Sequence, residues 1–574
     1  MDSFQSYFHR GGEIALLGQT IPQRFAEIVS RYPEHEAVVS LPQNQRVTYL
    51  QFSKRIDTVA KGLLAYGSKP GDRIGIWSTN NIEWLIIQMA TARIGVILVN
   101  INPSNRAPEL AYALKRSEVQ ALFLIPAFRG SHYVELLAEQ LPEIKGAETG
   151  SSATKAPPPA LKSETFPLLQ RVFLYEPQNS ETSTRPYTGF TLWQELLEAG
   201  KDISDLELDS ITASLDFDDP INIQYTSGTT GSPKPVVLSH HNILNNAYFA
   251  AQAMALSPDD SLCIPLPFYH CFGMVLSNLV CFSVGAKLVI PSEHFDPLLT
   301  LKAISQEKCT ALHGVPTMFI AQLEHSDIAQ FKLNSLRTGI MAGAPCPAEL
   351  MKRVIAEMHC KDILIGYGQT EASPLTHLTT ADDTFERRIH TVGKNLPHQE
   401  VKVICTETGK IQPHGEVGEI CFRGHHVMLG YYKDQEATNK TIDGKGWLHS
   451  GDLGTMDKDG YVRITGRLKE MVIRGGENIY PAEIEEVIFN HPNVEQVAVF
   501  GIPDTYLGEE LVAWVRLKQG KALNEQALRE YCKEHLAHFK IPKLIQFIDD
   551  FPMTVTGKLQ KFKMREMAIQ QSCE

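Results

Sequence analysis

Apolar runs with the spacings of helices and of strands alternate along the first part of the chain, and this alternation restricts the fold more than any other feature. Apolar positions four, three and four residues apart between Phe52 and Leu63 lie on one face of a predicted helix. The short apolar run from Arg73 to Ser78 predicts a buried strand. The alternation continues through Asn100, which predicts βαβ units and therefore a parallel sheet.

The length and a change of pattern predict a division into two unequal parts. With 574 residues the chain is too long for one compact core. Its last third changes to short β-like runs, with a hairpin signal at Asp459-Gly460 and a helix start at Pro481. We predict an α/β N-terminal domain at residues 1–466 and an α+β C-terminal domain at residues 467–574.

One run, YTSGTTGSPKPVVLSH from Tyr225 to His240, has the residue types of a phosphate-binding loop. Glycines without a Cβ let backbone N–H groups approach an anion, and hydroxyl groups and a lysine add further donors. The order of residues is not that of a P-loop, which ends in Gly-Lys-Ser/Thr. A solvated turn between two strands is the alternative for the run taken alone. The candidate phosphate-binding residues are Thr226, Ser227, Gly228, Thr229, Thr230, Gly231 and Lys234.

Composition and charge restrict the partners and the location. A formal net charge of −12 disfavours nucleic acid, whose phosphates need a basic surface. Ten cysteines without a C-x-x-C pair fit neither a zinc site nor a disulfide framework, and indicate a reduced intracellular protein. The sequence contains no apolar run long enough to span a membrane, and no signal or transit peptide or terminal Ser-Lys-Leu. We expect a cytoplasmic protein, with peroxisome and mitochondrion left open. The Gly-, Ser- and Pro-rich stretch 146–164 is interpreted as a surface insertion loop.

The motifs TSGTTG, GAP, GYGQTE, SGDLG, GRLK and TGK occur in this order and together carry a family resemblance. The chain resembles the adenylate-forming superfamily, which includes acyl-CoA synthetases, coumarate-type ligases, peptide-synthetase adenylation domains and firefly luciferase. The resemblance extends from about Phe25 to Lys563. It implies two α/β subdomains and a β-rich subdomain, followed by a small mobile C-terminal domain. One departure is Pro235, where the family usually has glycine, so the path of the loop beyond Lys234 is left open.

The resemblance implies which residues bind the nucleotide. Thr370 would contact the α-phosphate, and Glu371 would bind Mg²⁺, which prefers oxygen ligands. Asp452 would accept hydrogen bonds from the ribose hydroxyls, with Arg467 as a second ribose contact. Taken singly, these residues are more often parts of turns or surface ion pairs. Further candidates are Gly343, Ala344 and Pro345 beside adenine, and Gly366, Tyr367, Gly368 and Gln369 in the second nucleotide motif.

The resemblance also implies residues for catalysis and for coenzyme A. Lys558 matches a catalytic lysine that bridges the acid and the α-phosphate, Lys469 matches an interdomain hinge, and His270 matches a gate between the acyl and nucleotide pockets. A lone lysine late in a chain is usually solvated, and a lone histidine in an apolar run is usually a core residue. The candidates for coenzyme A are Gly475, Gly476, Lys540 and Lys543, with a solvated basic face as the alternative for the lysines.

We therefore predict an AMP-forming acid–thiol ligase of fatty-acid metabolism that uses ATP, Mg²⁺ and coenzyme A. Acid and ATP would give acyl-adenylate and pyrophosphate, and the thiol of coenzyme A would then give thioester and AMP. The apolar surroundings of Phe272, Gly273 and Met274 favour a medium-chain fatty acid or a related lipophilic acid.

Other functions are weighed against the same residues. A ligase of aryl or other specialised-metabolite acids and a luciferase-like oxygenase share every nucleotide motif and stay open. A peptide-synthetase module is disfavoured because no carrier domain is seen after Lys558. A non-catalytic nucleotide-binding protein is disfavoured because Glu371 and Lys558 are both present. A serine hydrolase is disfavoured because the chain has no G-x-S-x-G motif.

Overall fold

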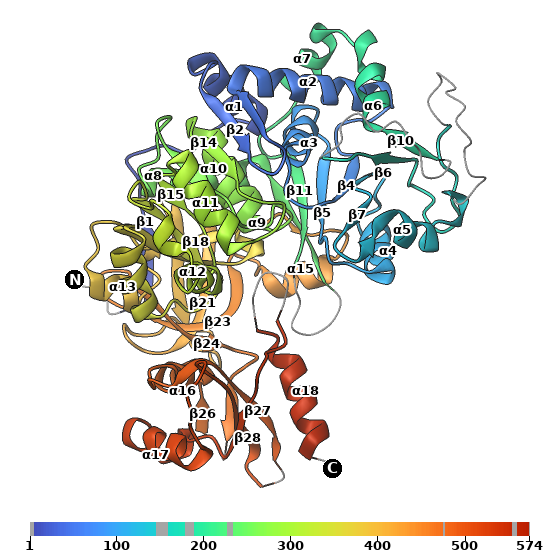
Figure 1. Cartoon of the computed structure of the whole chain (residues 1–574). Helices are drawn as coiled ribbons and strands as arrows, with labels where there is room; N and C mark the ends of the chain where they lie inside the picture. Colours follow the sequence, from blue (N-terminus) through green and yellow to red (C-terminus); the bar gives the residue numbers. More distant parts are fainter. Residues whose placement is uncertain are drawn as a thin grey trace.

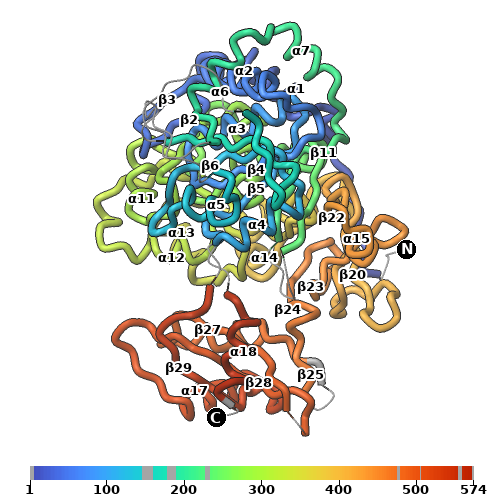
Figure 2. Tube along the Cα trace, turned by 90° about the vertical axis from the view of Figure 1, so that its right-hand side faces the viewer, coloured from blue at the N-terminus to red at the C-terminus, as the bar shows by residue number. Residues whose placement is uncertain are grey.

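The chain folds into a large N-terminal part and a small C-terminal part, which lies below it in Figure 1. The computed structural model describes residues 5–144, 159–177, 189–226, 233–474, 477–504, 506–553 and 559–572. Figure 2 shows the same division from the side, with the chain passing downward from β24 into the C-terminal part. The predicted combination of a large N-terminal part with sheets and helices and a small α+β part is confirmed.

Two large sheets with parallel centres form the core of the N-terminal part, as the alternation of helix and strand patterns predicts. In the first sheet the strands from β10 to β11 run parallel, whereas β12 and β22 are antiparallel to their neighbours. Its order is β10 (Phe190–Leu192), β9 (Arg171–Leu174), β6 (Ala121–Leu124), β4 (Arg73–Trp77), β5 (Ile97–Ile101), β11 (Pro220–Tyr225), β12 (Pro235–Ser239) and β22 (Gly430–Tyr431).

The second sheet has a longer parallel centre, which runs from β17 to β2. Its outer strands β18, β19 and β3 pair antiparallel. Its order is β19 (Lys394–Asn395), β18 (Leu375–Leu378), β17 (Asp362–Gly368), β16 (Thr338–Ala342), β15 (Ala311–Leu312), β13 (Ser261–Cys263), β14 (Lys287–Ile290), β2 (Glu36–Ser40) and β3 (Gln45–Thr48).

Helices cover these two sheets, and their positions follow from the sequence. The predicted helix between Phe52 and Leu63 is α2, and α3 is buried from Ile82 to Ala92 because nearly all its residues are apolar or small. The bounds are α1 (Ile21–Arg31), α2 (Tyr49–Ala65), α3 (Ile82–Arg93), α4 (Ala107–Arg116), α5 (Tyr133–Gln140), α6 (Trp193–Ala199), α7 (Asp205–Ala213), α8 (His240–Ala253), α9 (Cys271–Gly273), α10 (Val280–Val284), α11 (Pro297–Glu307), α12 (Pro316–Leu323), α13 (Ala348–Glu357), α14 (Phe385–His390) and α15 (Gln435–Thr441). None of the helices in the described ranges is long and apolar enough to cross a membrane.

A third sheet is antiparallel throughout and joins β1, near the start of the chain, to strands that come after residue 398. The predicted hairpin at Asp459-Gly460 is confirmed, because it joins β23 and β24 and Gly460 has a φ of +84° that favours glycine. The order of the sheet is β1 (Tyr7–Arg10), β20 (Gln399–Ile404), β21 (Gly418–Gly424), β23 (Leu448–Met456) and β24 (Val462–Arg467).

The C-terminal part is an α+β unit, as predicted. Its first helix begins at Pro481, and in its second helix Leu528 and Cys532 are buried while Tyr531 is partly exposed. The domain boundary between residues 466 and 467 stays a prediction. The elements are β25 (Val472–Arg474), β26 (Glu477–Ile479), α16 (Pro481–Phe489), β27 (Val494–Asp504), β28 (Gly508–Leu517), α17 (Glu525–His535), β29 (Leu544–Phe547) and α18 (Lys561–Ser572).

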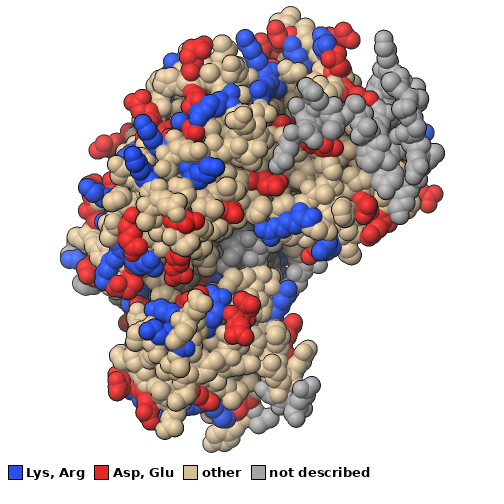
Figure 3. Space-filling view, viewed as in Figure 1, with Lys and Arg blue, Asp and Glu red and all other residues tan. Residues whose placement is uncertain are grey.

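Two features concern the surface of the molecule. The predicted insertion loop lies largely outside the described residues, and residues 159–164 at its end form neither helix nor strand. On the face drawn in Figure 3, acidic and basic side chains are interspersed, and the outline narrows between the two parts of the chain.

Candidate active site

Two candidate motifs meet at the carboxyl end of the second sheet. Strands β16 and β17 are parallel neighbours, with Ala342 paired to Gly366. The GAP residues follow β16 directly, and Gln369 follows β17, so the two turns lie side by side. Ligands of open parallel sheets bind at such strand ends. The structure therefore brings together segments that the sequence predicts to bind adenine and the α-phosphate.

Glycine is required at two places in these turns. Gly343 has a φ of +91°, a conformation that L side chains rarely adopt. A Cβ added to Gly368 would lie 1.8 Å from the carbonyl oxygen of Pro374. Both turns thus depend on the glycines that made the motifs recognisable in the sequence.

The ribose candidates form a connected group. Asp452 is 4% exposed, and its carboxylate accepts a hydrogen bond of 2.6 Å from the Tyr367 hydroxyl. The second carboxylate oxygen lies 3.1 Å from Nε of Arg467, which pairs with Asp452 across β23 and β24. Asp452 raises the pKa of Arg467, while burial raises that of Tyr367. The structure thus joins three predicted residues, although their contact with a ribose stays a prediction.

The candidate phosphate loop connects β11 to β12. Tyr225 pairs with Pro235, and the backbone N–H of Thr226 donates to the carbonyl of Lys234 over 3.1 Å, which closes the base of the loop. Pro235 is the first residue of β12, a position where a strand tolerates the missing N–H. The path beyond Lys234, left open by the sequence, is therefore a strand. Ser227, Gly228, Thr229, Thr230 and Gly231 lie outside the described residues.

Tyr431 links the phosphate loop to the predicted magnesium ligand, and sequence reasoning missed it. Its hydroxyl donates to Glu371 over 2.8 Å, and the Lys234 ammonium lies 4.7 Å from the centre of its ring. The pairing of β12 with β22 places Tyr431 beside Val236. Because this contact depends on strands that are nearly two hundred residues apart, the motifs gave no signal for it.

Cys271 contacts both His270 and Thr370. The Cys271 sulfur lies 3.8 Å from Nδ1 of His270 and 3.6 Å from the hydroxyl oxygen of Thr370. Nδ1 of His270 also accepts a hydrogen bond of 3.1 Å from the backbone N–H of Phe272, and thereby caps the short helix α9. The capping contact fixes the ring, whereas the role of His270 as a gate stays a prediction.

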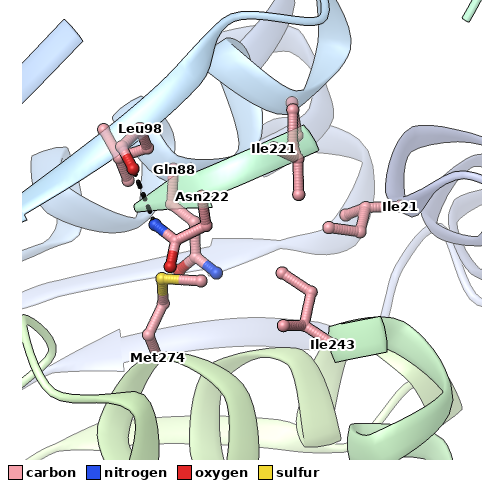
Figure 4. Close-up of a pocket in the computed structure, with 8 residues that line it drawn as sticks. Ile21, Gln88, Leu98, Ile221, Asn222, Ile243 and Met274 are labelled. Carbon is pink, nitrogen blue, oxygen red and sulfur yellow. Dashed lines mark hydrogen bonds between the residues drawn. The ribbon is translucent and has the colours of Figure 1, made fainter. Parts of the chain in front are cut away.

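Apolar residues follow His270 in the chain, and their role as an acyl pocket stays a prediction. The centres of the Phe272 and His313 rings lie 5.6 Å apart. Burial lowers the pKa of His313 to about 3, so its imidazole is neutral near pH 7. In Figure 4, Met274 points toward Asn222 in a small cavity. The residues lining this cavity are Ile21, Gln88, Ala92, Leu98, Ile221, Asn222, Ile243 and Met274.

The C-terminal candidates are less closely connected. Lys540 bonds both carboxylate oxygens of Glu483 at 2.7 Å, and Lys543 lies 3.7 Å from Glu510. Lys469 lies in the turn after β24. Gly475, Gly476 and Lys558 fall outside the described residues, so the roles predicted for the hinge, the catalytic lysine and coenzyme A stay predictions.

Comparisons with known proteins agree with this architecture. A model of the AMP-binding enzyme family matches residues 25–432, and one of the AMP-binding enzyme C-terminal domain matches residues 483–558. The chain is 48% identical to the Bacillus subtilis (strain 168) protein YngI, named as a candidate acyl-CoA synthetase, over 97% of this chain and 98% of YngI. It is 40% identical to the Danio rerio medium-chain acyl-CoA ligase ACSF2, mitochondrial, over 99% of this chain and 91% of that protein.

Solved structures lead to the same conclusion. ATP-bound MatB from Rhodopseudomonas palustris matches with a TM-score of 0.79 and 27% identity, over 96% of this chain and 99% of MatB. The anthranilate CoA ligase AuaEII matches with a TM-score of 0.82 at 24% identity, which supports the fold. The predicted resemblance to adenylate-forming enzymes is thus confirmed. The chain belongs to the family of AMP-binding enzymes.

Proposed function

We propose that the chain is an AMP-forming acyl-CoA ligase that activates a carboxylic acid with ATP and transfers the acyl group to coenzyme A. The observation that carries the proposal is the linkage of Lys234, Tyr431 and Glu371, which connects two nucleotide motifs distant in the sequence. The near full-length similarity to a protein named as an acyl-CoA ligase supports the choice of reaction.

The residues have separate tasks in the adenylation step. Lys234 supplies a cation to the phosphates, and Asp452 supplies a buried acceptor for the ribose. When the acid attacks the α-phosphate, negative charge gathers there as pyrophosphate leaves, and Thr370 offers a hydroxyl donor beside it. The proposed division of tasks thus assigns charge to the phosphate loop and orientation to the group around Asp452.

Glu371 is the proposed ligand for Mg²⁺. Mg²⁺ prefers oxygen ligands such as a carboxylate. The hydrogen bond from Tyr431 fixes the Glu371 carboxylate in place, so this carboxylate fits the ion. The bound ion would neutralise phosphate charge. The residues of the chain itself orient the carboxylate and place Lys234 on the same tyrosine.

The proposed substrate is a medium-chain or related lipophilic acid. Apolar residues around Phe272 and Met274 favour buried methylene groups, because each gains about 0.8 kcal/mol, whereas an unpaired ammonium costs several. The name of the Danio rerio relative points the same way. The name of that relative also describes it as mitochondrial. For this chain we propose the cytoplasm as the location.

A pyrophosphate-release screen tests the proposal. Short, medium, long and aromatic acids and amino acids would each be assayed with ATP, with and without coenzyme A. We expect medium-chain acids to give the highest rates and to form thioester only with coenzyme A. Rates for amino acids or aryl acids that equal those for fatty acids would contradict the substrate proposal. Light emission or oxygen uptake would indicate a luciferase-like oxygenase.

Lys558 and Gly476 should separate the two half reactions if the C-terminal part rotates about Lys469. We expect Lys558→Ala to slow acyl-AMP formation about 10²- to 10³-fold but to leave thioester formation from supplied acyl-AMP. Gly476→Trp should do the reverse. Single-turnover assays of each step, with the exposed Lys563→Ala as control, measure this. Equal loss of both steps in folded Lys558→Ala would contradict the rotation.

A further inference from the structure

Three side chains with metal-binding atoms meet on the antiparallel sheet, outside the candidate active site. Glu419 and Cys421 are two residues apart on β21, so they lie on the same face. His449 on β23 pairs directly with Cys421 across the sheet. One carboxylate oxygen, the sulfur and an imidazole nitrogen all lie within 4.8 Å of one another. This juxtaposition gives three different ligand types around one point.

The distances between these atoms are close to those around a tetrahedral ion. Cys421 Sγ lies 3.7 Å from Nδ1 of His449, compared with about 3.6 Å for a sulfur and a nitrogen on tetrahedral Zn²⁺. The Glu419 carboxylate lies 2.9 Å from the same nitrogen, compared with about 3.3 Å in such a site. For this pair of atoms the difference is about 0.4 Å, and the carboxylate oxygen lies within 4.8 Å of the sulfur.

Asp443 lies within ion-pair distance of the other ring nitrogen of His449, although beyond the length of a hydrogen bond. Histidines that bind a metal usually direct the other ring nitrogen to a carboxylate, carbonyl or water. Oδ2 of Asp443 lies 3.8 Å from Nε2 of His449. Its other oxygen accepts hydrogen bonds of 2.8 and 2.9 Å from the backbone N–H groups of Lys445 and Trp447. The aspartate is thus held in place on the far side of the imidazole.

We propose that Glu419, Cys421 and His449 bind Zn²⁺, with a water as the fourth ligand. A set of one thiolate, one imidazole and one carboxylate suits zinc and is unsuited to Mg²⁺, so this site differs in kind from Glu371. Burial raises the pKa of the Cys421 thiol, so the metal has to displace its proton. The ligands come from two strands, which is why the absence of C-x-x-C does not exclude a zinc site.

The zinc site is connected to the ribose candidate through the backbone. Oε1 of Glu419 accepts a hydrogen bond of 3.1 Å from the N–H of Gly451. Asp452 is the residue that follows Gly451 in the chain. A metal that draws Glu419 toward His449 therefore acts on the segment that presents Asp452.

Zinc binding to the full chain tests the proposal. The protein would be treated with a chelator, dialysed and titrated with Zn²⁺ by calorimetry, and with Co²⁺ as a spectroscopic probe. We expect one equivalent of tightly bound Zn²⁺ and a thiolate-to-cobalt charge-transfer band. Cys421→Ser should weaken binding at least about 100-fold.

Cys405→Ser is the matched control. Hydrogen bonds from Thr408 lower the pKa of the Cys405 thiol, so adventitious metal would bind there first. This variant should bind zinc as the wild type does. Equal affinity of Cys421→Ser and wild type, or a Co²⁺ complex without the thiolate band, would overturn the proposal. If Cys421→Ser does not fold, Asp443→Asn should weaken binding about tenfold, and unchanged affinity there would overturn it too.

Discussion

The nucleotide end of the candidate site and its acyl end are held together by different interactions. At the nucleotide end Asp452 contacts Tyr367 and Arg467, and Tyr431 donates a hydrogen bond to Glu371. Each contact is directional, and those of Tyr367 with Asp452 and of Tyr431 with Glu371 join segments distant in the sequence. At the proposed acyl end the Phe272 ring packs against the ring of His313, and this contact involves no hydrogen bond from the Phe272 side chain. Removing one partner of a directional contact leaves the other unsatisfied, whereas trimming an apolar wall costs in proportion to the area lost.

This difference predicts that substitutions at the nucleotide end cause larger losses, seen in kcat/KM for ATP. Substitutions at the acyl end should cause smaller changes, seen in the kinetic constants for the acid. Substitutions of Asp452, Tyr431 and Phe272 test this difference. They are ordered by the size of the expected effect, and each separates the kinetic constants for ATP from those for the acid.

The largest of the three effects is expected for Asp452→Asn. The amide keeps the shape but removes the charge that faces Arg467, and charged hydrogen bonds contribute about 1.5–3 kcal/mol each. We expect kcat/KM for ATP to fall about 100-fold, with KM for the acid nearly unchanged. Pyrophosphate release at varied ATP measures this. Asp459→Asn, which breaks an exposed pair with Arg387, is the control, and an equal change in KM for the acid would contradict the comparison.

The sequence predicted those parts of the molecule that depend on local patterns. The apolar spacing from Phe52 to Leu63 predicted α2, and the Asp459-Gly460 turn predicted the hairpin, because both depend on neighbouring residues. Gly343 and Gly368 stood out in their motifs, and the structure shows that a side chain would be strained or would clash at each of them.

Contacts that depend on strand pairing could not be predicted in this way. Tyr431 reaches Glu371 only because β22 pairs with β12, and Cys421 faces His449 only because β21 pairs with β23. Neither pairing leaves a local pattern in the residues themselves. The acyl end is also hard to read from sequence, since the cavity near Met274 is lined from α1, α3, β5, β11 and α8.

A smaller effect at the nucleotide end is expected for Tyr431→Phe. The substitution removes the hydrogen bond to Glu371 but keeps the ring beside Lys234. We expect about a tenfold loss in kcat/KM for ATP and a requirement for more Mg²⁺, measured by titrating Mg²⁺ in the pyrophosphate assay. Tyr432→Phe is a matched control, because the neighbouring hydroxyl bonds Glu118 over 3.1 Å. An unchanged Mg²⁺ dependence in Tyr431→Phe would contradict a role of this hydroxyl in positioning Glu371.

The smallest effect is expected at the acyl end, for Phe272→Leu. A smaller side chain lengthens the proposed pocket, and a buried methylene group gains about 0.8 kcal/mol, which is about fourfold in kcat/KM for each additional methylene accommodated. The preference should therefore shift toward longer acids while KM for ATP stays the same. Competition between acids of increasing length measures the shift, with Phe268→Leu, a buried residue of the same run packed against Trp84, as the control for lost packing. If Phe272→Leu changes KM for ATP as much as the chain-length preference, the two ends do not act independently and the comparison fails.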